Sequence, residues 1–247
     1  EPYRRQRQMC IRDRLEITPK TGEIKSTPHN LKLILENDIN LVGKVAYNDF
    51  SFRTVLLDSM PWRSIKQGVT WNDTDDSCLR NYLSNVYGVK GQQVIYDACA
   101  EVFTRNHFHP VRDYIKAKEW DGTPRVDTLW IDYLGADDKD YVRTVTRKHL
   151  VAAVARVFSP GCKFDNVIIL CGPQGIGKST MLKKLGREWF SDSLTSVQGK
   201  EAYEQLHGVW IAELGELYAT RKAESEAVKQ FLSKSEDIFR VAYGLSL

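Results

Sequence analysis

One short stretch, CGPQGIGKST at residues 171–180, constrains the fold of this 247-residue chain more than any other part of it. From Gly172 to Ser179 it matches the pattern G-x-x-x-x-G-K-[ST], whose glycines let the backbone turn so that successive N–H groups face an anion. The apolar run NVIIL precedes the stretch, and KSTMLKKL continues from it with a helical pattern. We therefore expect a buried parallel strand, a phosphate-binding turn and a helix, in this order.

The positions of the turn have distinct expected roles. Backbone N–H groups and the N-terminus of the following helix hold phosphate oxygens. Lys178 supplies an ammonium for the β- and γ-phosphates, and Ser179 a hydroxyl ligand for Mg²⁺, with Thr180 as a structural neighbour. A glycine-rich turn with a chance lysine is the alternative, and the flanking strand and helix disfavour it. The predicted cofactors are thus ATP and Mg²⁺, and the predicted nucleotide-binding residues are Gly172, Pro173, Gln174, Gly175, Ile176, Gly177, Lys178, Ser179 and Thr180.

A second acidic element follows in GVWIAELGEL, where residues 209–212 form a short apolar strand that ends at Glu213. A carboxylate at a strand end can hold the metal shell, and one nearby can orient or deprotonate the attacking water. We assign the metal role to Glu213 and the water role to Glu216. The alternative for Glu216 is that it begins an exposed helix, where acids are common. The predicted catalytic residues are Lys178, Glu213 and Glu216, and the predicted metal ligands are Ser179 and Glu213.

Composition narrows the class of protein. With 42% hydrophobic and 27% charged residues, the chain is typical of a globular protein rather than a disordered one. No apolar run is long enough to cross a bilayer and no signal peptide opens the chain, so we expect a cytoplasmic protein. Five scattered cysteines predict neither a disulfide framework nor a zinc site, and a net charge of +3 is too small to argue for nucleic acid.

The two ends of the chain show little of the residue patterning that is typical of helices and strands. Residues 1–14 are basic and lack apolar periodicity, and we exclude them from the fold as part of a disordered or non-native leader at 1–29. A basic arm that touches phosphates is the functional alternative. At the other end the chain stops at AYGLSL without cap or turn chemistry, and we expect it to be cut short.

Helical patterns dominate the middle of the chain. One helix is expected from the acids of NDTDDS to Gly88, a second in QQVIYDACAEVFTRN and a third in DYVRTVTRKHLVAAVARVF. The acids Asp73, Asp75 and Asp76 suit a helix N-terminus better than a metal site. His107 and His109 lack a Cys or acidic partner at ligand spacing, which disfavours a metal there. The side chains expected to face inward are Leu79, Tyr82, Leu83 and Val86 in the first helix and Val142, Val145, Leu150, Val154 and Val157 in the third.

Taken together, several stretches resemble the virulence-associated protein E family, P-loop ATPases of phages and mobile islands that are related to superfamily 3 helicases. They are FHPVRDYI, WDGTPRVDTL, HLVAAVARVFSPGCKFDNVIILCGPQGIGKST, GVWIAELGEL and VKQFLSKSEDIFRVAYG. The resemblance implies an ATPase in replication of a mobile element that works as a homo-oligomeric ring, with ATP between subunits and DNA, expected single-stranded, in the channel. It carries over Gly172, Gly175, Gly177, Lys178 and Ser179 as the nucleotide loop, and Glu213 and Glu216 as the acids of the second motif.

We therefore expect an α/β, three-layer P-loop NTPase domain at 139–247, incomplete at its C-terminus and preceded by a mainly helical, mixed α+β domain at 30–138. The expected function is that of a DNA-dependent ATPase of the replicative helicase type. The family's polar sensor and neighbour-completing arginine are not found after Gly244, so nucleotide binding is expected and hydrolysis by this chain is left open. Lys229 and Arg240 lie where they could reach nucleic acid or a neighbouring subunit, although a solvated face is the default.

Two alternative functions remain at this point. A P-loop kinase shares the loop, but it predicts a lid with clustered arginines, whereas Arg187, Arg221 and Arg240 are widely spaced. A regulatory or interference protein would use ATP as a conformational clamp without helicase activity. Stimulation of ATP turnover by single-stranded DNA discriminates this clamp from the helicase.

Overall fold

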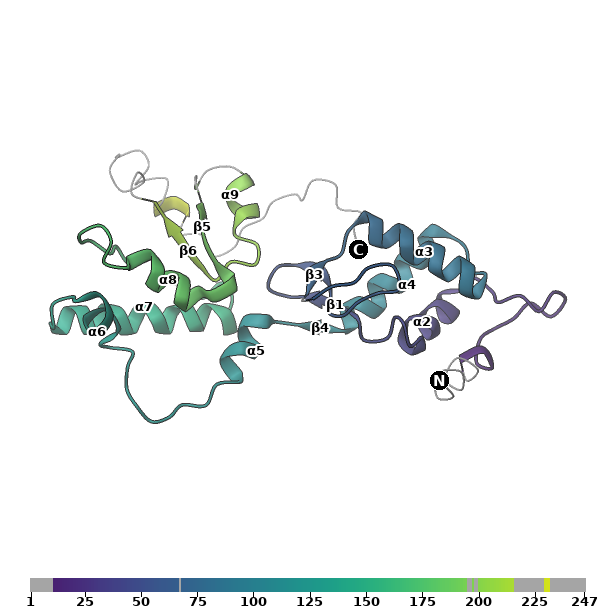
Figure 1. Ribbon diagram of the computed structural model, residues 1–247, viewed down its shortest axis with the longest axis horizontal. Helices are drawn as coiled ribbons and strands as arrows, with labels where there is room; N and C mark the ends of the chain where they lie inside the picture. Colours follow the sequence, from purple (N-terminus) through teal and green to yellow (C-terminus); the bar gives the residue numbers. More distant parts are fainter. Residues whose placement is uncertain (1–10, 67, 195–196, 198–199, 216–228, 232–247) are drawn as a thin grey trace. The chain divides into compact units, whose positions relative to one another are not determined.

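The computed structural model describes residues 11–66, 68–194, 197, 200–215 and 229–231 (Figure 1). The chain divides into two compact units that meet between His109 and Pro110. Both combine helices with small sheets, so the described part is a mixed α/β structure. This division rests on contacts between residues and does not show which parts of the chain fold independently. The domain boundary predicted after residue 138 therefore stays a prediction. No described helix is both long and apolar enough to cross a membrane.

The first unit is built on a four-stranded sheet with the strand order β3-β2-β1-β4. Strand β1 pairs antiparallel with β2 and parallel with β4, and β2 pairs antiparallel with β3. Helix α4 packs against both α2 and β1, and side chains from all three helices and from β1 and β2 form one apolar core. The elements are α2 (Pro28–Asn37), β1 (Val45–Asn48), β2 (Arg53–Leu56), β3 (Val69–Thr70), α3 (Asp73–Tyr87), α4 (Gln92–Arg105) and β4 (His107–Phe108).

Residues 11–29 belong to this unit, which corrects the expectation that they stand apart from the fold. Ile11 and Leu15 are buried in the apolar core. The fully buried Asn30 holds the segment, because its amide nitrogen donates to the carbonyls of Glu16 and Lys25 and its oxygen accepts from the Glu16 N–H. A buried amide with three partners fixes a segment that has little periodicity of its own.

Helix α3 confirms the helix predicted to end at Gly88. Asn72 caps its N-terminus in a capping box with Asp75, and Gly88 ends it in the left-handed conformation with φ of 69°. Leu79 and Leu83 are buried in the core, with Tyr82 and Val86 partly buried beside them. The helical spacing thus predicted the buried face correctly.

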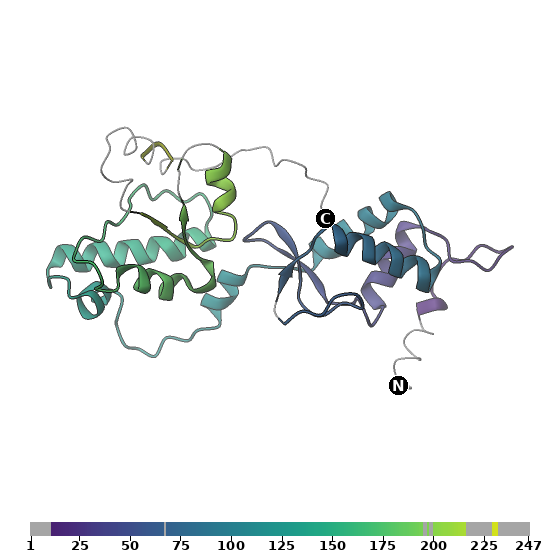
Figure 2. The ribbon, with the colours of Figure 1, turned by 45° about the horizontal axis from the view of Figure 1, so that its top comes forward.

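The second unit contains a two-stranded parallel sheet of β5 and β6, with α8 packed against both strands (Figure 2). Helix α7 is the longest described helix, and α5 and α6 pack against it. The elements are α5 (Pro110–Lys116), α6 (Leu129–Leu134), α7 (Asp140–Phe158), α8 (Lys178–Gly186), the 3-10 turn η1 (Arg187–Trp189), β5 (Phe190–Leu194), α9 (Lys200–Gln205) and β6 (Ile211–Leu214).

Two expectations for this unit are wrong. Residues 166–170, expected as a buried strand, pair with no described strand, and Val167 and Ile169 are 46% and 71% exposed. A β-rich apolar run becomes a strand only where a neighbouring backbone can pair with it. In α7, Val157 is buried as predicted but Val154 is 37% exposed, because the helix buries one face and Val154 lies at its edge. The described residues therefore contain no closed three-layer domain.

Candidate phosphate-binding site

The turn before α8 has a backbone that favours glycine at three positions. Gly172, Gly175 and Gly177 have φ angles of 158°, 87° and 94°, a region that L side chains rarely adopt. At Gly172 a Cβ would also lie 3.0 Å from Cδ1 of Ile176. At these three positions the absence of a side chain thus allows a backbone conformation that other residues rarely adopt.

The backbone N–H groups of residues 174–180 donate to no acceptor in the described part of the chain. Those of residues 178–180 belong to the first turn of α8, whose N–H groups have no partner within the helix. Oxygen atoms of a phosphate are suitable acceptors for such a series of donors at the positive end of a helix dipole. The segment that the sequence predicts to bind phosphate therefore has unused donors.

Lys178 begins α8, and its side chain turns back over the loop. The ammonium nitrogen Nζ lies 2.8 Å from the carbonyl oxygen of Gly172 and 2.8 Å from that of Pro173. The ammonium therefore joins the start of the loop to its end. Two of its three N–H donors are used in this way.

Ser179 and Glu213, the two predicted metal ligands, are in direct contact. The Ser179 hydroxyl donates a hydrogen bond of 2.6 Å to Oε1 of Glu213. The other carboxylate oxygen, Oε2, is buried and has no hydrogen-bond partner in the described residues. A buried carboxylate oxygen without a partner is costly, and a cation beside it would remove that cost. The contact brings together two residues that are far apart in the chain, and their role as metal ligands stays a prediction.

The position of Glu213 depends on how α8 packs against β6. Gly186, the last residue of α8, is buried, and a Cβ there would lie 2.8 Å from Cβ of Phe190 and 3.2 Å from Cβ of Ile211. A glycine at this point lets the helix approach both strands closely. Gly186 was not among the predicted residues, although a glycine at the end of an apolar helical pattern is a usable signal.

A tryptophan pair fixes the start of β6. Trp210 donates its backbone N–H to the carbonyl of Trp189 at 2.7 Å and its indole N–H to the carbonyl of Ala153 on α7 at 3.0 Å. The two indole rings meet edge to face with centroids 6.4 Å apart. Helix α7, the turn η1 and the start of β6 are thereby joined, a contact that was not predicted from the sequence.

A further aromatic contact joins α5 to the end of α8. The Tyr114 ring packs on Trp189 with centroids 5.6 Å apart, and the Arg187 guanidinium lies 4.8 Å from the Tyr114 ring centroid. Contact with Tyr114 raises the pKa of Arg187 above its usual value. Arg187 has a φ of 53°, so its backbone adopts an uncommon conformation where α8 ends.

The structure describes only some of the remaining predicted residues of the site. Thr180 is exposed, and its side chain makes no hydrogen bond within the described residues, so its role stays a prediction. Lys229 is exposed as well. The predicted water-orienting residue Glu216, together with Arg221 and Arg240, lies outside the described residues.

Asp75, Asp76 and His107, which were considered as metal ligands in the sequence, make contacts with other side chains. Asp75 accepts from the Trp62 indole, the Arg63 guanidinium and the Asn72 backbone, and Asp76 accepts from the Trp71 indole. His107 contacts Asp49 at 2.8 Å. Within the described residues no group of three or more His, Cys, Asp or Glu side chains could hold a metal.

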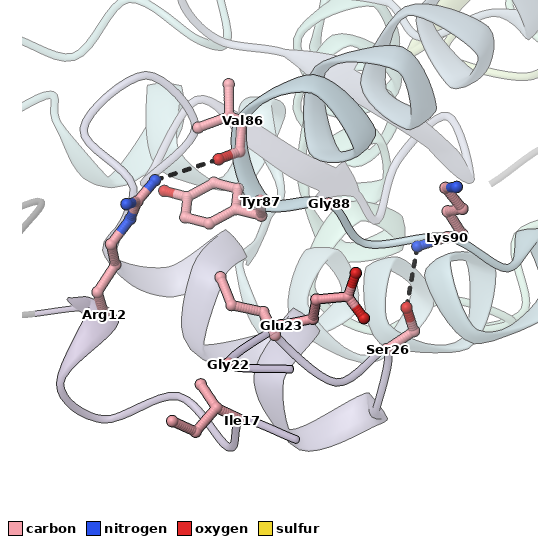
Figure 3. A pocket seen from close by; sticks show the side chains of 10 residues that line it. Arg12, Ile17, Gly22, Glu23, Ser26, Val86, Tyr87, Gly88 and Lys90 are labelled. Carbon is pink, nitrogen blue, oxygen red and sulfur yellow. Dashed lines mark hydrogen bonds between the residues drawn. The ribbon is translucent and has the colours of Figure 1, made fainter. Parts of the chain in front are cut away.

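The first unit also has an open pocket of about 540 Å³ (Figure 3). Its two cationic side chains, Arg12 and Lys90, lie at opposite ends of it, and Arg12 donates to the carbonyl of Val86 at 3.4 Å. Because no cluster of polar groups converges there, the pocket has no feature of a phosphate site.

Comparison with known proteins bears on the second unit. Residues 115–247, just over half of the chain, match the model of the virulence-associated protein E-like domain. The match begins within α5 and includes the loop and Glu213. A search of curated proteins finds no match.

Proposed function

The chain belongs to the virulence-associated protein E-like family, and from this premise we propose that it is a DNA-dependent ATPase of the replicative helicase type. ATP binds at residues 172–180, and its hydrolysis drives movement along DNA. The observation that carries the proposal is the contact between Ser179 and Glu213, which brings the hydroxyl of the loop and the acid of the second motif to 2.6 Å. If the glycine-rich turn matched the phosphate-loop pattern only by chance, there would be no reason for Glu213 on β6 to contact Ser179.

The residues present fit Mg²⁺. This ion prefers oxygen ligands and commonly keeps waters and substrate phosphates in its shell, so a site with few protein ligands suffices. The Ser179 hydroxyl and the Glu213 carboxylate supply hard oxygens, and the unpartnered Oε2 is the atom that most needs a cation. When bound, the ion neutralises charge on the phosphates.

The chain's own groups then hold and orient the triphosphate. The unused N–H groups of residues 174–180 donate hydrogen bonds to its oxygens, and the remaining N–H donor of Lys178 reaches the β- and γ-phosphates. These donors stabilise the negative charge that develops as water attacks the γ-phosphate. The water-orienting role stays proposed for Glu216.

A P-loop NTPase fold for residues 139–247 is part of the same proposal. Parallel pairing of β5 with β6 and the packing of α8 on both strands support it, because phosphate loops of this class lie beside parallel strands. The proposed partners, single-stranded DNA and further copies of the chain in a ring, rest on the family alone.

The test is ATP turnover by the full chain with and without single-stranded DNA, at two salt concentrations. We expect DNA to raise turnover and the increase to fade with salt, because phosphate contacts release counterions. Lys178→Ala serves as the inactive reference. If ATP binds and DNA leaves its turnover unchanged, the helicase assignment is wrong and a nucleotide-dependent clamp takes its place.

A further inference from the structure

Arg187 has a backbone conformation that a glycine would adopt at lower cost. Its φ of 53° and ψ of −131° lie in a region that L side chains rarely occupy. Helices commonly end in a glycine with a positive φ, because glycine has no Cβ. In this chain the glycine stands one position earlier, at Gly186, where the close packing of α8 on β5 and β6 needs it. An arginine kept at a strained position is a reason to ask what its side chain does.

The Arg187 side chain lies against an aromatic ring that a second cation also approaches. Helix α5 lies beside the end of α8, so the Arg187 guanidinium is 4.8 Å from the Tyr114 ring centroid (Figure 1). The Lys118 ammonium nitrogen is 5.8 Å from the same centroid. Tyr114 also packs on Trp189, which holds its ring in place. Because Lys118 and Arg187 are both exposed, the ring and its two cations face solvent.

These two cations differ from the arginines of α7, which pair with acids. Arg143, for example, makes an ion pair with an aspartate. Lys118 and Arg187 make no ion pair in the described part of the chain, although Glu119 and Glu188 follow them directly in the sequence. The surface therefore carries positive charge that no carboxylate of the described residues neutralises. Further exposed lysines that make no ion pair there are Lys116, Lys183 and Lys184.

An exposed tryptophan follows in the same segment. Trp120 comes two residues after Lys118, and its side chain is 77% exposed. Its indole N–H donates to the carbonyl of Thr123 at 3.3 Å, which fixes the orientation of the ring. An indole that faces solvent beside lysine and arginine is suited to stack on a base that has no pairing partner.

We infer that Tyr114, Lys118, Trp120 and Arg187 form a binding surface for single-stranded DNA. The cations contact backbone phosphates, and the aromatic rings stack on bases, a combination that binds single strands without sequence preference. A duplex keeps its base faces stacked inside and cannot use the rings in this way. Charge and aromatic rings account for a single-stranded nucleic acid. The choice of DNA over RNA rests on the proposed function, which this surface deepens.

The test is binding of a fluorescent thymidine oligonucleotide to the full chain, measured by anisotropy at several salt concentrations without nucleotide or metal. Arg187→Gly removes the guanidinium and relieves the backbone. It should weaken binding about fivefold or more, and the slope of log K against log[salt] should fall by about 0.7, because one phosphate contact is lost. Trp120→Ala should weaken binding about as much and keep the slope, because stacking on a base releases no counterion.

Arg143→Ala is the matched control, since it removes the same charge from another exposed arginine. Helix α5 contacts α7 at Val157, where Arg112 donates to the carbonyl at 2.7 Å, and Arg143 lies about 21 Å from that point along the helix. The control should bind the oligonucleotide as wild type does. Denaturant unfolding of each variant supplies the second readout, and Arg187→Gly should be no less stable than wild type.

The inference is overturned if the wild-type chain binds anionic lipid vesicles but not the oligonucleotide, or if Arg187→Gly binds the oligonucleotide as wild type does. In the latter case a loss of stability would show that Arg187 only joins α5 to α8. If Arg187→Gly loses both stability and binding, Trp120→Ala decides, because its exposed position leaves the fold intact. Binding is measured without ATP. If both variants weaken binding while DNA leaves the ATP turnover of wild type unchanged, the surface stands and the proposed function fails.

Discussion

The hydroxyl of Ser179 at the start of α8 and the Glu213 carboxylate on β6 share a hydrogen bond of 2.6 Å, across 34 positions of sequence. The bond leaves Oε2 of Glu213 buried without a partner in the described residues. The bond joins the two residues that we propose as ligands of Mg²⁺. We therefore expect that changes to either residue alter ATP binding mainly when Mg²⁺ is present.

Ser179→Ala should weaken ATP binding in the presence of Mg²⁺ by about tenfold or more, which corresponds to about 1.4 kcal/mol. Binding without Mg²⁺ should change little, because the loop N–H groups and Lys178 remain. Calorimetric titration with ATP in Mg²⁺ and in EDTA measures both values, and Thr180→Ala is the matched control. An equal loss under both conditions would show that Ser179 does not act through the metal.

Glu213→Gln keeps the shape of the side chain and removes its charge. We expect it to lower the affinity for Mg²⁺ in the nucleotide complex and to raise stability without ligand, since a neutral amide costs less to bury without a partner than a charged carboxylate. Thermal unfolding without nucleotide and a Mg²⁺ titration at fixed ATP measure the two effects. A variant that is less stable without ligand and binds Mg²⁺ normally would argue against this role.

Gly186→Ala should destabilise the second unit by about 1–3 kcal/mol through overpacking, because its Cβ would lie 2.8 Å from Cβ of Phe190. Gly215→Ala is the control, since a Cβ there meets no atom within 4 Å. Denaturant unfolding of both variants gives the comparison. Equal midpoints for the two would mean that α8 can move away from the strands at no cost.

The loop shows what could and could not be predicted from the sequence. The left-handed glycine conformations and the closeness of Ser179 to Glu213 agree with the local pattern of the motifs, whereas the roles assigned to these residues stay predictions. The irregular structure of residues 166–170, where we expected a strand, was not predictable, because strand formation depends on a partner backbone that no local pattern supplies. The contacts of Gly186 and Trp210 were missed for a related reason, since both depend on which elements meet in three dimensions.

Trp210→Phe should cost about 1 kcal/mol of stability, because it removes the indole donor to the Ala153 carbonyl while keeping an aromatic ring against Trp189. Trp120→Phe is the matched control, since Trp120 is 77% exposed and its indole bond to Thr123 lies at the surface. Chemical unfolding of the two variants measures the difference. If both cost the same, the link between β6 and α7 contributes nothing beyond a surface hydrogen bond.

The first unit should lose stability in alkali through Tyr82. Burial, together with the hydrogen bond that its hydroxyl donates to the fully buried Asp38 at 2.8 Å, raises the pKa of Tyr82 to about 12 from a usual value of 10.0. The folded state thus favours the protonated phenol. This contribution is complete below pH 10 and is lost as the pH rises from 10 to about 12, because the unfolded chain releases the proton first.

Tyr82→Phe removes this titration and should flatten the part of the stability profile between pH 10 and 12 that Tyr82 causes. At neutral pH the variant should be less stable by about 1–2 kcal/mol, since Asp38 loses one of its donors. Tyr87 also donates to Asp38, at 2.7 Å, and burial raises its pKa as well, so a residual slope is expected. Urea unfolding across this range is the measurement, with Tyr141→Phe, 76% exposed, as the control. A Tyr82→Phe profile parallel to wild type would show that the phenol ionises as easily in the folded protein as in the unfolded chain.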